Sequence, residues 1–248
     1  MRLAVAGGTG LAGRYVVEAA EASGHDVIPL ARSAGVNTQT GEGLADALAG
    51  VDIIIDTTNS PTTEQGPATD FFVESTTNLA HLGAEAGVRH LVVLSIVGID
   101  KVPTGYYAAK LAQETAALEG PVAATIVRTT QFHEFAAQVI RWNRKGAVAK
   151  IPNVRTRTVA ARTVGVVLVR DAVTRPAGRA ADLGGPAEAD LVDLARRFAT
   201  QFGLAVDIVP AESEVPDRVW IPSDGARFEG PAFSTWLLSD DAALLGRA

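Results

Sequence analysis

Tyr106 and Lys110 are the two residues whose types and spacing are best suited to chemistry. They stand four positions apart in a segment where Pro103 and Thr104 predict a helix start, so both side chains lie on one helix face. A phenol has a pKa of roughly 10, and a neighbouring ammonium lowers that pKa by favouring the phenolate. The pair therefore predicts general acid–base catalysis by Tyr106, with Lys110 also donating to a ribose hydroxyl of a cofactor. The alternative is an amphipathic helix with a packed aromatic ring and a solvated lysine.

A glycine turn near the start of the chain predicts a nucleotide site. The apolar run at 3–6 predicts a buried strand, and from Leu11 the apolar residues recur at helical spacing. Gly7 permits a sharp turn, Gly10 lets the backbone approach a pyrophosphate, and Gly13 lets helix and strand pack tightly, while the helix N-terminus faces the anion. A tight turn without a ligand is the alternative. The expected cofactor contacts of this turn are Gly7, Thr9, Gly10, Leu11 and Gly13.

Arg32 and Ser33 follow the second predicted strand, residues 26–31, which Pro29 makes short or irregular. An acidic residue at this strand end binds the ribose 2′-hydroxyl in NAD-binding versions of such a unit. Here an arginine stands instead, as pairing with a 2′-phosphate requires. We therefore expect Arg32 and Ser33 to bind the cofactor, with NADP(H) preferred over NAD(H); the alternative is an exposed loop arginine.

Three polar residues end the next strand. The continuous apolar run at 51–56 is typical of a central parallel strand, and Thr57, Thr58 and Asn59 follow it. At the carboxyl end of a strand beside a nucleotide loop, such side chains suit contact with the adenosine and ribose. They suit turns and helix capping equally well.

The order of the remaining elements predicts an α/β fold. A helix over 70–87 is followed by a strand at 90–95 that ends in Ser95, a helix from about 104, and a strand at 123–128. Strands alternate with helices and no hairpin signal appears. This pattern predicts a doubly wound parallel sheet with helices on both faces.

Taken together, these motifs resemble the short-chain dehydrogenase/reductase superfamily, and more narrowly its atypical NmrA-like NAD(P)-binding branch. The resemblance rests on Gly7-Gly8-Thr9-Gly10-x-x-Gly13, on Leu-Ser95 at a strand end, on Tyr106-x-x-x-Lys110 and on Thr125-Ile-Val-Arg-Thr-Thr-Gln-Phe132, and it covers residues 1 to 175. It implies a Rossmann fold and a nicotinamide cofactor. It also implies a catalytic set in which Tyr106 is the acid/base, Ser95 holds the substrate carbonyl and Lys110 binds the cofactor ribose.

The resemblance also assigns the loop after the strand at 123–128. In the family this loop passes the nicotinamide ring, which implies cofactor contacts from Thr129 and from Phe132, the latter covering the ring or shaping the substrate pocket. His133 is a second candidate proton donor, and a polar surface histidine is the alternative.

The C-terminal part is less regular. We expect a dinucleotide-binding domain over residues 1–150, and residues 151–248 completing the sheet and forming a small α/β substrate lobe. Helices are expected at 158–173 and from Leu191 to Phe202, with a strand at 206–209. The late aromatic cluster of Trp220, Phe228, Phe233 and Trp236 suits a substrate lid, a dimer contact or plain core.

Composition excludes several classes. The 248 residues carry a formal charge of −6 and contain no basic block, which argues against nucleic-acid binding. There is no cysteine, so disulfides, thiolate metal sites and cysteine nucleophiles are excluded, and the four histidines lack metal-ligand spacing. The sequence contains neither an 18-residue apolar run nor a signal-peptide pattern. We therefore expect a cytoplasmic protein with a small-molecule substrate and no membrane or nucleic-acid partner; a homo-oligomer stays open.

These observations predict an NADP(H)-dependent oxidoreductase that transfers hydride between nicotinamide and a small carbonyl, quinone or similar acceptor. Two alternatives remain. A non-catalytic NADP(H) sensor or regulator is favoured by the short separation of Ser95 and Tyr106, eleven positions. An epimerase or dehydratase with a tightly held cofactor is the other, and the short C-terminal part counts against it.

Overall fold

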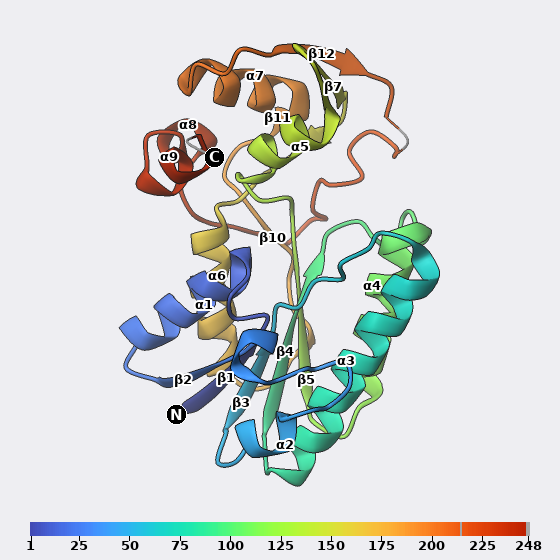
Figure 1. Ribbon diagram of the computed structural model, residues 1–248, viewed down its shortest axis with the longest axis vertical. Helices are drawn as coiled ribbons and strands as arrows, with labels where there is room; N and C mark the ends of the chain where they lie inside the picture. Colours follow the sequence, from blue (N-terminus) through green and yellow to red (C-terminus); the bar gives the residue numbers. More distant parts are fainter. Residues whose placement is uncertain (214, 247–248) are drawn as a thin grey trace. The chain divides into compact units, whose positions relative to one another are not determined.

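The computed structural model describes residues 1–213 and 215–246, and it divides into two compact units (Figure 1). The first comprises Met1–Arg128 and Val164–Ala181, and the second comprises Thr129–Thr163 and Asp182–Ala248. The boundary expected at residue 150 lies inside the segment 129–163 of the second unit. The chain therefore leaves the first unit at the end of a strand, returns for one helix, and leaves again.

The first unit is built on a sheet in the order β2-β1-β3-β4-β5. Its strands are β1 (Arg2–Ala6), β2 (Asp26–Leu30), β3 (Ile53–Asp56), β4 (His90–Ile96) and β5 (Ala124–Thr129), the last residue of which is counted with the second unit. Strand β1 pairs in parallel with β2 and β3, and β3 pairs in parallel with β4. This order, with the first strand central and crossovers to either side, is the Rossmann arrangement, which confirms the predicted fold class.

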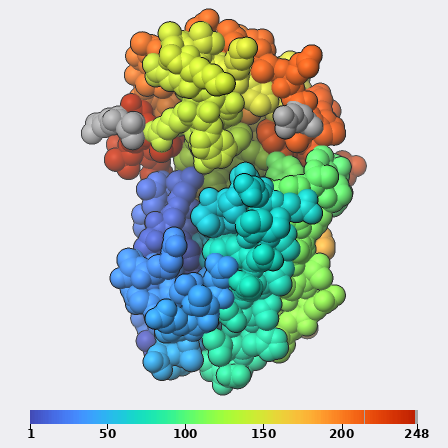
Figure 2. All heavy atoms as spheres, turned by 45° about the vertical axis from the view of Figure 1, so that its right-hand side comes forward, coloured from blue at the N-terminus to red at the C-terminus, as the bar shows by residue number. Residues whose placement is uncertain are grey.

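Helices cover both faces of this sheet. Figure 1 shows α1 (Leu11–Ala22) and α6 (Ala161–Ala172) on one side, and α3 (Gln65–Glu85) and α4 (Gly105–Glu119) on the other. In Figure 2 the cyan-to-teal atoms of α3 lie on the face of this unit that is turned toward the viewer, beside the blue atoms of the N-terminal segments. The strands β1, β3 and β4 are buried along almost their whole length, as strands covered on two sides must be.

Two details explain departures from the predicted elements. Pro29 lies in β2, which pairs only with β1 among the strands of the first unit, so its missing amide group removes no essential ladder bond. Helix α3 begins at Gln65, not at Asp70, because Pro67 occupies its first turn, where a proline is tolerated.

A glycine that the sequence pattern did not single out lets α6 approach α1. A Cβ atom at Gly165 would lie 2.6 Å from the backbone carbonyl group of Tyr15. Tyr15 itself is buried, and any side chain at 165 would push the two helices apart.

Among the described residues, the second unit carries two small sheets and, in addition, two short strands that belong to the same sheet as β5. The strands β12 (Asp207–Ala211), β7 (Val148–Pro152) and β6 (Arg144–Lys145) form one, β8 (Arg155–Thr156) and β11 (Ala189–Asp190) a second, while β10 (Leu183–Gly184) pairs with Thr129 and with β13 (Arg227–Phe228). Its helices are α5 (Phe135–Asn143), α7 (Leu191–Gln201), α8 (Phe233–Trp236) and α9 (Asp240–Gly246).

Most of the aromatic residues near the C-terminus belong to the hydrophobic core. Trp220, Phe233 and Trp236 are buried, and the ring centroids of Phe233 and Trp236 lie 5.4 Å apart. Phe228 is the exception, with 45% of its surface exposed under the guanidinium of Arg157.

Among the described residues, none of the helices combines the length and the hydrophobicity that crossing a membrane requires.

Candidate active site

The glycine turn is folded so tightly that a side chain cannot be accommodated at Gly7 or Gly13. Gly7 has a φ of +72°, and a Cβ on it would lie 2.9 Å from the carbonyl oxygen of Thr57. A Cβ on Gly13 would lie only 2.1 Å from the carbonyl oxygen of Gly7. The amide of Gly10 donates to the same oxygen at 2.9 Å, which closes the turn. The sequence-based roles of Gly7 and Gly13 thus have a steric basis in the structure.

This turn leaves a helix N-terminus open to a ligand. Gly10 is the N-cap of α1 and has no side chain to accept from the first-turn amides, and the first turn contains no acidic residue. The first intrahelical bond from this region is donated by Arg14 to the carbonyl of Gly10, so the amides of residues 11–13 have no acceptor within the helix. Thr9 is exposed beside them. Free amides and the positive end of a helix dipole are the elements of an anion site.

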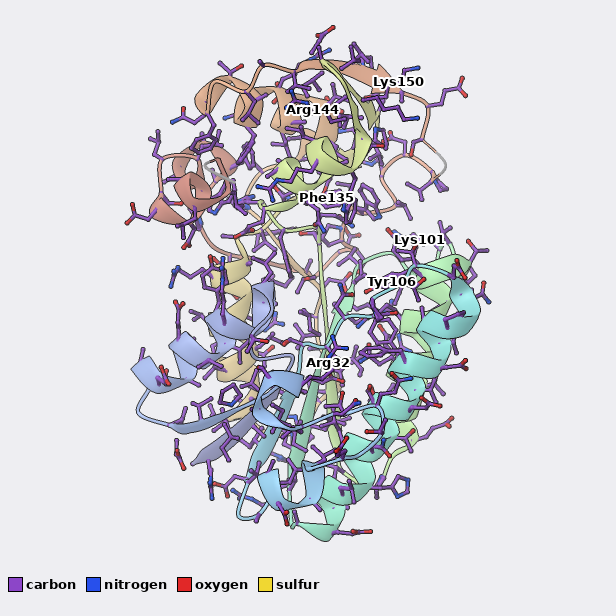
Figure 3. The ribbon with its side chains drawn as sticks, in the orientation of Figure 1. Arg32, Lys101, Tyr106, Phe135, Arg144 and Lys150 are labelled. Atoms are coloured by element: carbon purple, nitrogen blue, oxygen red, sulfur yellow. The ribbon has the colours of Figure 1, made fainter. Side chains whose placement is uncertain are left out.

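Arg32 and Ser33 lie in a single 3-10 turn, Arg32–Ala34, directly after β2, and both are exposed (Figure 3). Because β1 and β2 are parallel neighbours, this turn and the glycine turn lie at the same edge of the sheet. A Cβ on Gly8 would come within 2.8 Å of the Cβ of Pro29, so the two segments are in direct contact.

The polar residues after β3 are engaged with protein atoms. Thr57 donates its hydroxyl to the carbonyl of Ala6 at 2.8 Å, and Thr58 donates its hydroxyl to Asp56 Oδ1 at 2.6 Å. Asn59 is exposed, and its Oδ1 accepts a hydrogen bond from the hydroxyl of Tyr106. The structure therefore shows a turn built by these side chains, and of the three only Asn59 reaches the first turn of α4.

Tyr106 lies in that first turn, two residues after the N-cap Thr104 (Figure 3). Its ring packs edge-on against Phe72, with the centroids 5.6 Å apart. Burial raises the pKa of its phenol, and Tyr107 adds to the rise. The expectation that Lys110 lowers this pKa was wrong for this structure: desolvation is the largest influence on the phenol, and the ammonium of Lys110 is bound elsewhere.

Lys110 is buried, with 4% of its surface exposed. Its Nζ donates to the carbonyl of Leu94 at 2.8 Å and to Oε1 of Gln113, and it stands 4.6 Å from the ring centroid of Phe72. Burial lowers the pKa of this amine to about 8, although Asp56 and then Glu114 act in the opposite direction. The solvated lysine of the alternative interpretation is therefore not observed.

The hydroxyl of Ser95 has a different partner. Its hydroxyl donates to Glu114 Oε1 at 2.6 Å, and Glu114, which is fully buried, also accepts from Arg128 at 2.7 and 2.8 Å. Arg179 approaches the second oxygen of Glu114 at 2.8 Å. The structure brings Tyr106 to Asn59 and Lys110 to Gln113, and it joins Ser95 to an internal ion cluster.

Sequence reasoning missed three residues of this buried network: Asp56, Gln113 and Glu114. Two of them could have been predicted from the sequence, because Gln113 and Glu114 follow Lys110 by three and four positions and therefore share its helix face. Asp56 ends an otherwise apolar strand and is fully buried, which a charged residue rarely is without partners.

The remaining candidates belong to the second unit. Thr129 is buried and pairs with Leu183, and Phe132 is half-buried in a bridge to Val159. His133 is buried between the hydroxyl of Thr158 at 2.7 Å and the carbonyl of Pro231 at 3.0 Å. Burial lowers its pKa to about 4. His133 is thus a core histidine, and neither a surface group nor a general acid at neutral pH.

Comparison with known proteins agrees with the first unit. A model of the NAD dependent epimerase/dehydratase family matches residues 3–119, from β1 to the end of α4. No curated protein matches the sequence.

Solved structures share the fold at low sequence identity. UDP-N-acetylglucosamine 4-epimerase from Bacillus cereus is 20% identical with a TM-score of 0.71, over 100% of this chain and 97% of that chain. A short-chain dehydrogenase/reductase superfamily protein from Agrobacterium tumefaciens with bound NAD is 17% identical with a TM-score of 0.72, over 100% and 97%. Triphenylmethane reductase from Citrobacter sp., complexed with NADP(H), is 16% identical with a TM-score of 0.64, over 90% and 87%. At such identities the likeness establishes the Rossmann fold.

Proposed function

We propose that the first unit binds a nicotinamide dinucleotide and that the chain is an NADP(H)-dependent oxidoreductase acting on a small carbonyl, quinone or similar acceptor. Within the short-chain superfamily, we place it nearest to the NmrA-like branch. The observation that carries the proposal is the glycine turn, in which a Cβ at Gly13 would lie 2.1 Å from a carbonyl oxygen and the amides of residues 11–13 have no acceptor within the helix. Such a turn fits a pyrophosphate closely, and the matched family model spans it.

The residues present fit the two ends of such a cofactor. The amides after Gly10 would bind the pyrophosphate, and Arg32 would pair with a 2′-phosphate through its planar guanidinium. Lys110 lies on the inner side of α4 and would bind the ribose next to the nicotinamide. When bound, the cofactor supplies the hydride.

Tyr106 is the candidate proton donor. Its phenol is protonated at neutral pH, as donation to a carbonyl oxygen requires, but burial, which raises its pKa, makes it a weaker acid than a free phenol. To donate to a substrate oxygen, its hydroxyl must leave Asn59 Oδ1, the acceptor that it has in this structure.

Calorimetric titration with NADPH and with NADH, followed by turnover with a panel of quinones and aldehydes, tests the proposal. We expect NADPH to bind more tightly, and Arg32→Ala to weaken NADPH far more than NADH. Equal losses for both nucleotides would remove the role of Arg32, and binding of neither would refute the proposal. Turnover should be abolished in Tyr106→Phe.

A non-catalytic NADP(H) sensor is the second candidate, and specific contacts favour it. The hydroxyl of Tyr106 donates to Asn59, the Lys110 amine donates to Leu94 and Gln113, and the hydroxyl of Ser95 donates to Glu114. Tight NADPH binding with no turnover for any acceptor would favour this function. An epimerase or dehydratase, supported by the name of the matched family, would instead retain its nicotinamide through purification and show no net cofactor consumption.

A further inference from the structure

A continuous chain of buried polar groups joins β3 to β4 through α4. The carboxylate of Asp56 accepts from Gln113 Nε2 at 3.0 Å, the other end of the Gln113 amide accepts from Lys110 Nζ, and Nζ donates on to the carbonyl of Leu94 at 2.8 Å. Asp56, Gln113 and Lys110 are exposed by 0%, 1% and 4%. All three side chains of this hydrogen-bonded series are therefore shielded from solvent.

The amide of Gln113 matches its two neighbours in one orientation only. An ionised carboxylate can only accept and an ammonium can only donate, so Nε2 must face Asp56 and Oε1 must face Lys110. Asp56 is held in its turn by the amide and hydroxyl of Thr58 at 2.9 and 2.6 Å, and by the hydroxyl of Thr76 at 3.2 Å. The position of Asp56 therefore fixes the position of the amide, and the amide fixes the ammonium.

Two acceptors hold the ammonium of Lys110. Of its three N–H groups, one donates to the Leu94 carbonyl and one to the Gln113 amide, and the face of the Phe72 ring lies 4.6 Å from Nζ. The charges that face it are Asp56 on β3 and Glu114 on α4, and Glu114 is itself compensated by Arg128 and Arg179.

We propose that Gln113 is a positioning residue for Lys110: its amide couples the Asp56 carboxylate to the ammonium and holds the amine on the cofactor side of α4. The functional part rests on the proposed cofactor role of Lys110. Without the Oε1 acceptor the ammonium loses one of its two hydrogen-bonding partners in a buried site, so its charged form becomes harder to maintain.

The amine of Lys110 can be observed directly. The chain has four lysines, and the other three, Lys101, Lys145 and Lys150, are exposed. The triple variant K101R/K145R/K150R therefore leaves a single lysine, and its 13Cε resonance in protein labelled on lysine reports the protonation of Lys110 alone. This triple variant is the parent for all measurements.

Two variants shift the titration of Lys110 in opposite directions. Gln113→Met keeps the length of the side chain and removes the acceptor, and we expect the midpoint to fall by about one pH unit or more. The pair Asp56→Asn with Gln113→Glu moves the carboxylate next to the amine and keeps a hydrogen bond between positions 56 and 113, and we expect the midpoint to rise. Gln138→Met on the exposed side of α5 is the matched control and should leave the midpoint unchanged. If Gln113→Met does not fold, the double variant Asp56→Asn/Gln113→Glu still tests the proposal.

Calorimetry with NADPH on the same samples separates this inference from the proposed function. Gln113→Met should weaken NADPH binding and raise the KM for NADPH more than it lowers kcat, whereas Gln138→Met should do neither. An unchanged Lys110 midpoint in both Gln113 variants would overturn the positioning role, even if the parent binds NADPH. If the midpoints move as expected and the parent binds neither nucleotide, the proposed function fails while the coupling of Gln113 to Lys110 stands.

Discussion

Glu114→Gln should be among the most destabilising conservative changes in the first unit. The carboxylate is fully buried and receives two hydrogen bonds from Arg128, at 2.7 and 2.8 Å, one from Ser95 at 2.6 Å, and the approach of Arg179 at 2.8 Å. Glutamine keeps the shape, but it replaces one acceptor oxygen with a donor that faces a guanidinium. The two guanidinium groups then lose this counter-charge, although Arg128 keeps its ion pair with Asp100 at 2.9 Å.

The size of the loss follows from the exposure of the partners. The Arg128 side chain is only 14% exposed, so removal of its buried partner costs about 3–5 kcal/mol. The Arg179 side chain is 52% exposed and is stabilised by water, so its share is small. We expect a loss of about 3 kcal/mol, which for a chain of this size lowers Tm by roughly 6–12 °C.

Urea unfolding followed by circular dichroism, with Tm from calorimetry, measures this loss. Glu119→Gln, at the exposed end of the same helix, is the matched control and should change stability by no more than about 0.5 kcal/mol. The double variant Glu114→Leu with Arg128→Met should be less destabilised than Glu114→Leu alone, because it also removes the guanidinium that has lost its buried counter-charge. A loss below about 1 kcal/mol in Glu114→Gln would refute the reasoning, since it would give the cluster the energy of a surface ion pair.

Three further predictions concern the turn, a core histidine and the buried lysine. Gly13→Ala should abolish NADPH binding in calorimetry, because its Cβ would lie 2.1 Å from the Gly7 oxygen; retained affinity would show that the turn does not cradle the ligand. Burial lowers the pKa of His133 from its ordinary value of 6.5 to about 4, so as pH falls from about 6.5 to 4 the unfolded chain binds a proton that the folded chain does not. Stability should therefore decline by up to about 3 kcal/mol over that window in urea titrations, and His133→Gln should flatten the decline; an equal slope in both would contradict the assignment. Because the pKa of Lys110 is lowered to about 8, the affinity of the free protein for NADPH should fall as pH rises through about 8, and Lys110→Met should remove this pH dependence; the same pH profile in both proteins would contradict a cofactor role for the amine.

The sequence by itself determined the Rossmann unit. Its apolar runs at 3–6, 51–56 and 90–95, the glycines at 7, 10 and 13, and the helical spacing from Leu11 are local signals, and each became the expected strand, turn or helix. Periodicity reports which faces are buried, and an alternating order of strands and helices permits few sheet topologies. The steric need for Gly13 was also foreseeable, because a close βα turn leaves no room for a side chain.

Only the tertiary structure decided the partners of the polar residues. Ser95 and Tyr106 carry no sequence signal that directs one to Glu114 and the other to Asn59, because both contacts join segments that are distant along the chain. The pKa of Tyr106 illustrates the reason: helical spacing to Lys110 predicts a lowered value, whereas burial, with a smaller effect of Tyr107, produces a raised one. Spacing fixes which side chains share a helix face, but burial and hydrogen bonding depend on what packs against that face, and this is set by the whole fold.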